Sequence, residues 1–140
     1  DWADFVAEEV VQAVEKKYFS AIKTGRENRA LLGASLAGIT SIHTALKHSG
    51  VFGRVGGQSV SFWIDDERIV KELEKLDASK NNFTFYIDDG TFEGVEDSRK
   101  VVKILKDKGY EVIYYEAEAG HNWTAWRDRL ADAFIPLFKR

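Results

Sequence analysis

The sequence predicts an α/β fold with about four parallel strands and helices on both faces, in the order α-βα-βα-βα-βα. Two observations support it. Short apolar runs alternate with longer segments in which apolar residues recur every three or four positions, and glycine, asparagine or aspartate marks most of the changes. Strands that alternate with helices pair in parallel through right-handed crossovers, with helices covering the sheet. The 140 residues show no repeat or linker, so residues 1–140 are expected to form one domain.

Turn-forming residues divide the first half of the chain into five elements. Apolar residues at helical intervals behind Asp4, a residue type that favours the N-cap, indicate an opening helix. Gly25 and Asn28 interrupt that pattern, and Gly50 ends a second helix. The predicted elements are a helix over 4–18, a strand over 30–32, a helix from Leu36 to about His48, a strand over 54–62 and a helix over 66–78.

The second half of the chain repeats the strand and helix alternation twice. Phe83–Ile87 is the clearest strand, because aromatic and β-branched residues run unbroken into Asp88, Asp89 and Gly90. Gly109 suits the C′ position of the next helix. The predicted elements are a strand over 83–87, a helix over about 96–108, a strand over 111–116, a loop over 117–120 and a last helix over about 126–137, whose final turn Pro136 loosens.

Composition and charge exclude several functional classes. The 20 basic and 23 acidic side chains give a formal net charge of −3, which does not favour nucleic acid as a partner. No run approaches 18 apolar residues, which argues against a membrane span. The absence of cysteine excludes disulfides, zinc–thiolate sites and a cysteine nucleophile. The three histidines are scattered, so no metal or other cofactor is expected, and the cellular compartment stays open.

Ser35 is a candidate nucleophile at the end of the first strand. Parallel α/β sheets carry functional groups outside the carboxyl ends of their strands. Ser35 lies among small residues in Gly33-Ala34-Ser35-Leu36-Ala37-Gly38, where a strained strand-to-helix turn can lift its hydroxyl clear of the sheet. The same pattern also suits a serine that only caps the helix.

His121 and a group of acids favour the catalytic interpretation. His121 follows a strand and precedes a helix at the same edge of the sheet, whereas His43 and His48 lie within or at the end of a helix. Serine, acid, histidine is the chain order of the α/β-hydrolase triad. The acids that follow the third strand are Asp88, Asp89 and Glu93.

Four segments carry a family resemblance across Phe5–Phe138, nearly the whole chain. They are LLGASLAG around Ser35, Phe52–Val55 leading to Gln58-Ser59 and Phe62-Trp63, the DDGTFE turn, and AGHNWTAWRDRL around His121. They resemble the C-terminal part of the putative-esterase family of α/β-hydrolases, which includes enterochelin esterases, feruloyl esterases, S-formylglutathione hydrolases and mycolyltransferases. One departure is Ala37, where the family usually has glycine.

The resemblance implies a serine carboxylic-ester hydrolase that acts on a small-molecule ester through an acyl-enzyme. Ser35 would attack the carbonyl, and His121 would take its proton. The family's acid position falls on Glu93, in Gly90-Thr91-Phe92-Glu93, with Asp89 as the alternative. Some family members manage with serine and histidine alone.

Further residues are implied around that triad. The backbone N–H of Leu36 would be one oxyanion donor. Trp63, Trp123 and Trp126 are candidate walls for an acyl or aryl group, although large aromatic residues more often belong to a core.

The chain is expected to be a C-terminal portion of an α/β-hydrolase that lacks the N-terminal strands. It contains no methionine, and only 34 residues precede Ser35, too few for the loop that supplies the second oxyanion donor in this fold. Losing one such donor costs on the order of 10²–10³ in rate, so weak activity is expected. The strand over Ala30–Gly33 would also form an exposed apolar edge, which predicts a homodimer or a partner fragment.

Two alternatives remain beside the esterase. The chain can be a catalytically incompetent fragment or a self-assembling module that keeps only the family's sequence. A flavodoxin-like or receiver-like domain is disfavoured, because no glycine-rich or hydroxyl-rich phosphate loop accompanies Asp88 and Asp89.

Overall fold

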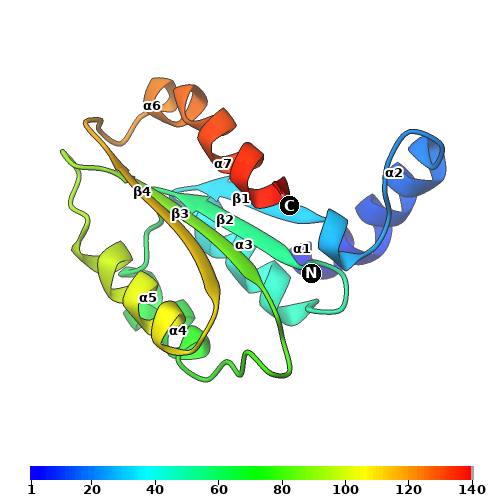
Figure 1. Cartoon of the computed structure of the whole chain (residues 1–140), viewed down its shortest axis with the longest axis horizontal. Coiled ribbons are helices and arrows are strands. Elements are labelled where there is room, and N and C mark those ends of the chain that lie inside the picture. Colours follow the sequence, from blue (N-terminus) through cyan, green and yellow to red (C-terminus); the bar gives the residue numbers. More distant parts are fainter. Residues whose placement is uncertain (140) are drawn as a thin grey trace.

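The computed structural model describes residues 1–139, and its helices and strands follow the predicted alternation (Figure 1). The elements in chain order are α1 (Trp2–Asp4), η1 (Phe5–Val10), α2 (Val11–Tyr18), η2 (Arg26–Asn28), β1 (Ala30–Ala34), α3 (Leu36–Lys47), β2 (Arg54–Gln58), α4 (Ile64–Leu73), β3 (Thr84–Gly90), α5 (Glu96–Asp107), β4 (Glu111–Ala117), α6 (Trp123–Asp128) and α7 (Leu130–Phe138).

The four strands form one parallel sheet in the order β1-β2-β3-β4, as predicted. Ala30 lies opposite Arg54, which in turn lies opposite Thr84. All strands run in the same direction, so their carboxyl ends meet at one edge of the sheet. β1 is an edge strand, and within residues 1–139 it pairs only with β2.

Helices cover both faces of the sheet. Side chains alternate between the faces of a strand, so Phe85 and Ile87 of β3 pack into the main core with α3, α4 and α5. Tyr86 faces the other way and packs against Ala133 and Leu137 of α7. Successive residues at the carboxyl end of β3 therefore lie on opposite faces of the sheet.

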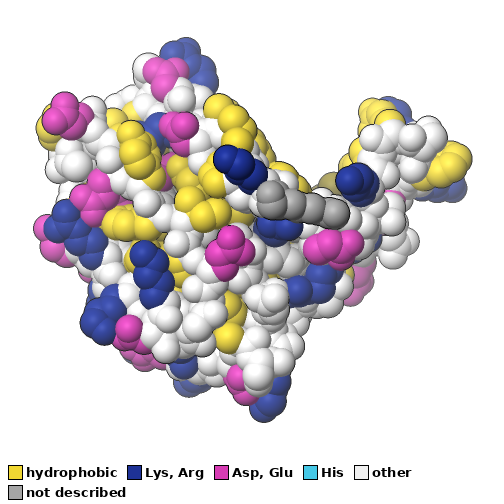
Figure 2. Space-filling view, in the orientation of Figure 1, with side chains coloured by type: hydrophobic (Ala, Val, Ile, Leu, Met, Phe, Trp, Pro, Cys, Tyr) yellow, Lys and Arg dark blue, Asp and Glu magenta, His cyan; other side chains and the backbone are white. Residues whose placement is uncertain are grey.

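The N-terminal helix begins earlier than predicted. α1, η1 and α2 form one continuous helical segment from Trp2, and its middle part is a π-helix. Asp1 is the N-cap, and its side chain accepts a hydrogen bond from the Asp4 N–H. The assignment of Asp4 as the cap was wrong, because Asp4 instead completes a reciprocal capping box. α2 projects away from the sheet (Figures 1 and 2).

Other predicted boundaries were also wrong: α4 covers Ile64–Leu73 where a helix over 66–78 was predicted, and β1 runs on to Ala34. β2 ends at Gln58, and the next residue, Ser59, has a left-handed φ of 49° that no continuing strand allows. The last helix is divided into α6 and α7 at Arg129, whose guanidinium bonds to Asp88 on β3. Pro136 does not open the end of α7, because the Lys139 N–H still donates to the Ile135 carbonyl.

The surface mixes charges of both signs, and apolar side chains gather around α7 on the face seen in Figure 2. Phe134, Ile135 and Phe138 are exposed there. Within residues 1–139, every helix is too short or too polar to cross a bilayer.

Candidate active site

Ser35 occupies the strained turn between β1 and α3. Its φ of 56° and ψ of −123° lie outside the regions that ordinary residues favour. The turn is tight because β1 passes close to α3: a Cβ on Gly33 would lie 2.2 Å from the Ala37 carbonyl oxygen. Gly33 therefore allows the backbone approach that brings the serine to the edge of the sheet.

Ala37 is accommodated without crowding this turn. Its side chain is exposed, and the close contact with Gly33 is made by its backbone. An alanine methyl group in place of the family's usual glycine therefore points away from the packed junction.

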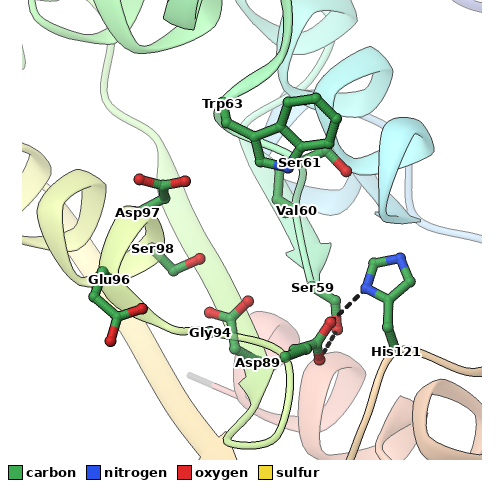
Figure 3. Close-up of a pocket in the computed structure, with 11 residues that line it drawn as sticks. Ser59, Val60, Ser61, Trp63, Asp89, Gly94, Glu96, Asp97, Ser98 and His121 are labelled. Atoms are coloured by element: carbon green, nitrogen blue, oxygen red, sulfur yellow. Dashed lines mark hydrogen bonds and ion pairs between the residues drawn. The ribbon is translucent and has the colours of Figure 1, made fainter.

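Ser35, His121 and Glu93 lie in one hydrogen-bonded row. The Ser35 Oγ is 3.0 Å from the His121 Nε2, and the His121 Nδ1 contacts the Glu93 Oε2, a contact drawn in Figure 3 as a dashed line from the His121 ring. The serine follows β1, the glutamate follows β3 and the histidine follows β4, so three separate strand ends supply the row. If Nδ1 carries the proton and donates it to Glu93, Nε2 is free to accept from the serine hydroxyl.

Glu93 is held in place by two further donors. Its Oε1 accepts a hydrogen bond from the Ser59 hydroxyl at 2.6 Å and from the Gly90 N–H at 2.7 Å. The indole N–H of Trp126 donates to the Ser59 Oγ at 2.9 Å, and the Trp126 ring packs edge-on against His121. Trp126 thus contacts both the histidine and the group that fixes its acid.

Sequence reasoning gave no role to Ser59 and Ser61. The Ser61 Oγ lies 3.3 Å from the Ser35 Oγ, and Ser59 bonds to Glu93. The sequence feature that could have indicated these two site residues was the polar pair Gln58-Ser59 at the end of a buried strand. A strand predicted to run on to residue 62 hid the turn that aims both hydroxyls at the site.

The predicted oxyanion donor is in a suitable place. Leu36 is the first residue of α3, so its N–H has no partner within the helix. It directly follows Ser35 at the N-terminal, positive end of that helix.

The three tryptophans line two separate cavities near the row. Trp63 is 66% exposed and lines a polar cavity of about 290 Å³ beside His121 and Glu93 (Figure 3). Trp123, 81% exposed, and Trp126, 9% exposed, line a mainly apolar cavity of about 250 Å³ that also touches Ala34. Trp126 is buried and its indole N–H is already bonded, so it offers a substrate only part of its ring.

Asp88 and Asp89 lie near the row but outside it. Asp88 is fully buried, and its Oδ1 accepts two hydrogen bonds from the Arg129 guanidinium at 2.9 and 2.7 Å. Asp89 is also buried, and its Oδ2 has no hydrogen-bond partner. Burial raises the pKa of Asp89 to about 7, the nearby Glu93 charge adds to the rise, and a hydrogen bond with Ser98 opposes it.

Asp4, Glu8 and His48 form a second cluster, away from the row. Their ligand atoms lie within 4.8 Å of one another, a grouping that the sequence did not suggest because Asp4 and His48 are 44 positions apart. The Lys47 ammonium lies 2.8 Å from the Asp4 Oδ1, so a protein cation already neutralises this carboxylate.

Comparisons with known proteins identify the family of the chain. The profile of the family described as "Putative esterase" matches residues 1–137. An acetyl esterase from Caldicellulosiruptor saccharolyticus is 31% identical over 108 residues, which make up 75% of this chain and 41% of that protein. The chain therefore spans less than half the length of this relative.

Solved structures share the fold. A ferulic acid esterase superposes with a TM-score of 0.83 at 18% identity, over 99% of this chain and 61% of that one. The enterobactin esterase of Shigella flexneri superposes with a TM-score of 0.80 at 18% identity, over 96% of this chain and 37% of that one. With the family profile matching nearly its whole length, the chain belongs to the putative-esterase family of α/β-fold hydrolases.

Proposed function

We propose that the protein is a serine carboxylic-ester hydrolase with Ser35 as nucleophile, His121 as general base and Glu93 as the acid that orients the histidine. The observation that carries the proposal is the 3.0 Å contact between the Ser35 Oγ and the His121 Nε2, with Glu93 behind the other ring nitrogen. A serine hydroxyl becomes a good nucleophile only when a base stands within hydrogen-bond reach.

The reaction would be acyl transfer in two halves. The Ser35 oxygen attacks the ester carbonyl while its proton passes to the His121 Nε2, and that proton then goes to the leaving alcohol. Water, deprotonated by the same nitrogen, attacks the acyl-enzyme carbonyl and releases the acid and free Ser35. The Leu36 N–H would stabilise the oxyanion, and the Glu93 carboxylate the imidazolium.

The expected rate is limited by the oxyanion site. In this fold a second donor comes from a loop that precedes the nucleophile turn, and the residues before Ser35 in this chain form the N-terminal helix and β1. One missing donor lowers kcat by on the order of 10²–10³. We therefore expect slow turnover by the 140-residue chain alone.

The substrate class is a small-molecule ester. The relatives include an acetyl esterase and a ferulic acid esterase, so acetyl and aryl-acyl esters are the first candidates. The mainly apolar cavity lined by Trp123 and Trp126 would receive an apolar group of the ester beside the nucleophile.

A fluorophosphonate probe tests the proposal directly, because it reports an activated serine without needing a known substrate. We expect covalent labelling of Ser35 in the wild-type chain, no labelling of Ser35→Ala and reduced labelling of His121→Ala. Ser41→Ala, on α3 away from the row, is the matched control and should label like the wild type. A folded protein that does not label would reject the esterase proposal for this chain.

The second candidate is a non-catalytic member of the family that folds and self-associates. The observation in its favour is the edge position of β1, whose outer side has no strand partner within residues 1–139. A second copy of the chain, pairing β1 with β1, would cover this edge. Size-exclusion chromatography with light scattering should then show a dimer at tens of micromolar, and a monomer across that range would reject the pairing.

A further inference from the structure

The polar cavity beside His121 has a strongly acidic lining. Its volume is about 290 Å³, and it lies between the turn after β2 and the first turn of α5. Within residues 1–139 no lysine or arginine lines it. Its charged and titratable lining residues are Asp89, Glu93, Glu96, Asp97 and His121.

Most of these carboxylates lack a cationic partner. Glu93 contacts His121, but Asp89, Glu96 and Asp97 form no ion pair within the described chain. Lys100, the nearest lysine on α5, bonds to Glu67 at 2.6 Å. The helix dipole stabilises acidic residues in the first turn of any helix, so Glu96 and Asp97 alone would not indicate a binding site.

Asp89 is the independent indication. Only 3% of its surface is exposed, it borders the cavity, and its Oδ2 has no hydrogen-bond partner. A buried carboxylate oxygen without a partner is costly. Figure 3 shows Asp89, Ser98 and Asp97 along one wall of the cavity, with His121 and Trp63 along the other. A cation in this space would stabilise the ionised form of the Asp89 carboxylate, which burial disfavours.

The cavity is lined by two residues that neighbour the nucleophile. Ser61 and His121 both line it, and these are the side chains whose Oγ and Nε2 lie 3.3 and 3.0 Å from the Ser35 Oγ. One part of an ester bound to Ser35, its acyl group or its alcohol group, would therefore extend into this polar cavity. The apolar cavity near Trp123 would hold the other part.

The geometry fits an organic cation better than a metal ion. Within residues 1–139, the group of three acidic or histidine ligands that converges within 4.8 Å is at Asp4, Glu8 and His48, and none is in this cavity. Separated carboxylates and an exposed aromatic face such as Trp63 suit a larger, delocalised charge. We propose that the cavity is a subsite for an ammonium group carried by the ester substrate.

This inference rests on the proposed esterase function, and a pair of isosteric substrates tests it. Acetylthiocholine and 3,3-dimethylbutyl thioacetate have nearly the same shape and differ in the charge of the quaternary centre. We expect kcat/KM of the wild-type chain to favour the cationic ester by about tenfold, equivalent to one charge-assisted contact.

Conservative variants locate the effect. Glu96→Gln and Asp97→Asn are exposed changes on α5 that should each lower the preference for the cationic ester several-fold, and together should remove it. Asp107→Asn, an exposed acid at the opposite end of the same helix, is the matched control and should leave the preference unchanged. An equal loss in all three variants would mean that only the overall negative charge attracts the cation, and would overturn the subsite.

A binding measurement separates this inference from the esterase proposal. Tetramethylammonium chloride should shift the NMR signals of the Ser98 amide and the Trp63 indole, with sodium chloride as the salt control and the Glu96→Gln/Asp97→Asn double variant as the negative control. If neither ester is hydrolysed but these shifts appear, the esterase proposal fails and the cation site stands. If the neutral ester is hydrolysed, the cationic ester gains no advantage and the shifts are absent, the subsite is overturned.

Discussion

Asp88 and Asp89 are neighbours at the end of the same strand, yet they are in opposite environments. Asp88 is bound by the Arg129 guanidinium, the Tyr86 hydroxyl and the Gln58 side-chain amide. Asp89 has a carboxylate oxygen without a hydrogen-bond partner and borders the polar cavity beside His121. Strand alternation explains the difference, because Asp88 faces α7 and Asp89 faces α5.

Glu93 is in a third environment. It lies beyond the end of β3, where the backbone has turned, so its longer side chain reaches His121 at the strand edge. The three acids therefore differ in role because of their positions and, for Glu93, the reach of its side chain. Asp88 stabilises the packing of α7, Asp89 borders the polar cavity, and Glu93 contacts the histidine. Each can be tested by removing its charge or its partner.

The largest effect is expected for the Glu93→Gln variant. A glutamine amide cannot stabilise the imidazolium that forms in the transition state, so kcat/KM should fall by about 10²–10⁴-fold. Hydrolysis of p-nitrophenyl acetate, corrected for the Ser35→Ala background, measures the loss. Glu118→Gln, an exposed acid in the loop before His121, should retain wild-type activity. Retained activity in Glu93→Gln would favour Asp89, or no acid at all, in the catalytic role.

Arg129→Leu should destabilise the fold strongly. The substitution leaves the Asp88 carboxylate buried without its cation, and breaking a buried pair costs about 3–5 kcal/mol. Urea unfolding followed by far-UV circular dichroism gives the free energy of unfolding. Arg127→Leu, two positions earlier and exposed in its contact with Asp128, should change it by less than about 1 kcal/mol. A similar loss of unfolding free energy in Arg129→Leu and Arg127→Leu would contradict the conclusion that the buried pair of Arg129 with Asp88 stabilises the fold.

Asp89→Asn should change how stability depends on pH. The ordinary pKa of an aspartate in an unfolded chain is about 3.9, and burial raises that of Asp89 to about 7 in the folded protein. Between about pH 4 and pH 7 the folded state therefore binds more protons, so the free energy of unfolding falls as pH rises through this window. The amide variant does not titrate and avoids this loss.

The measurement is the free energy of unfolding of Asp89→Asn and of the wild type, from urea unfolding at pH 5 and at pH 8. Between these pH values the unfolding free energy of the variant should rise by about 1–3 kcal/mol relative to that of the wild type. Asp128→Asn, an exposed acid, should show no such trend. A difference that is the same at both pH values would mean that the buried carboxylate is not the titrating group.

Ser59→Ala should have the smallest effect of the four. It removes one of two hydrogen bonds to the Glu93 Oε1, and a bond to a charged group contributes about 1.5–3 kcal/mol. We expect kcat to fall about tenfold with little change in KM, because the serine acts by positioning the acid. Trp126→Phe, which removes the indole donor to Ser59, should lower kcat in the same direction, whereas Trp123→Phe should not.

The sequence predicted the architecture well because strand and helix patterns are local. Alternating apolar runs gave four parallel strands and their covering helices, and the strand ends located Ser35, His121 and the acids at one edge. One boundary that failed, the break in the last helix, depends on a distant contact. The break at Arg129 reflects a bond to Asp88, 41 positions away, and a helical pattern contains no information about such a partner.

By itself, the sequence determined the order of the elements and the edge at which the polar groups gather, since both follow from periodicity and parallel pairing. Only the tertiary structure decided which acid contacts His121, which is buried with Arg129 and which lacks a partner, because these outcomes depend on the side of the strand and the reach of each side chain. It also revealed Ser59 and Ser61 beside the row. A left-handed turn after β2 places them there, and residue type alone did not predict that turn.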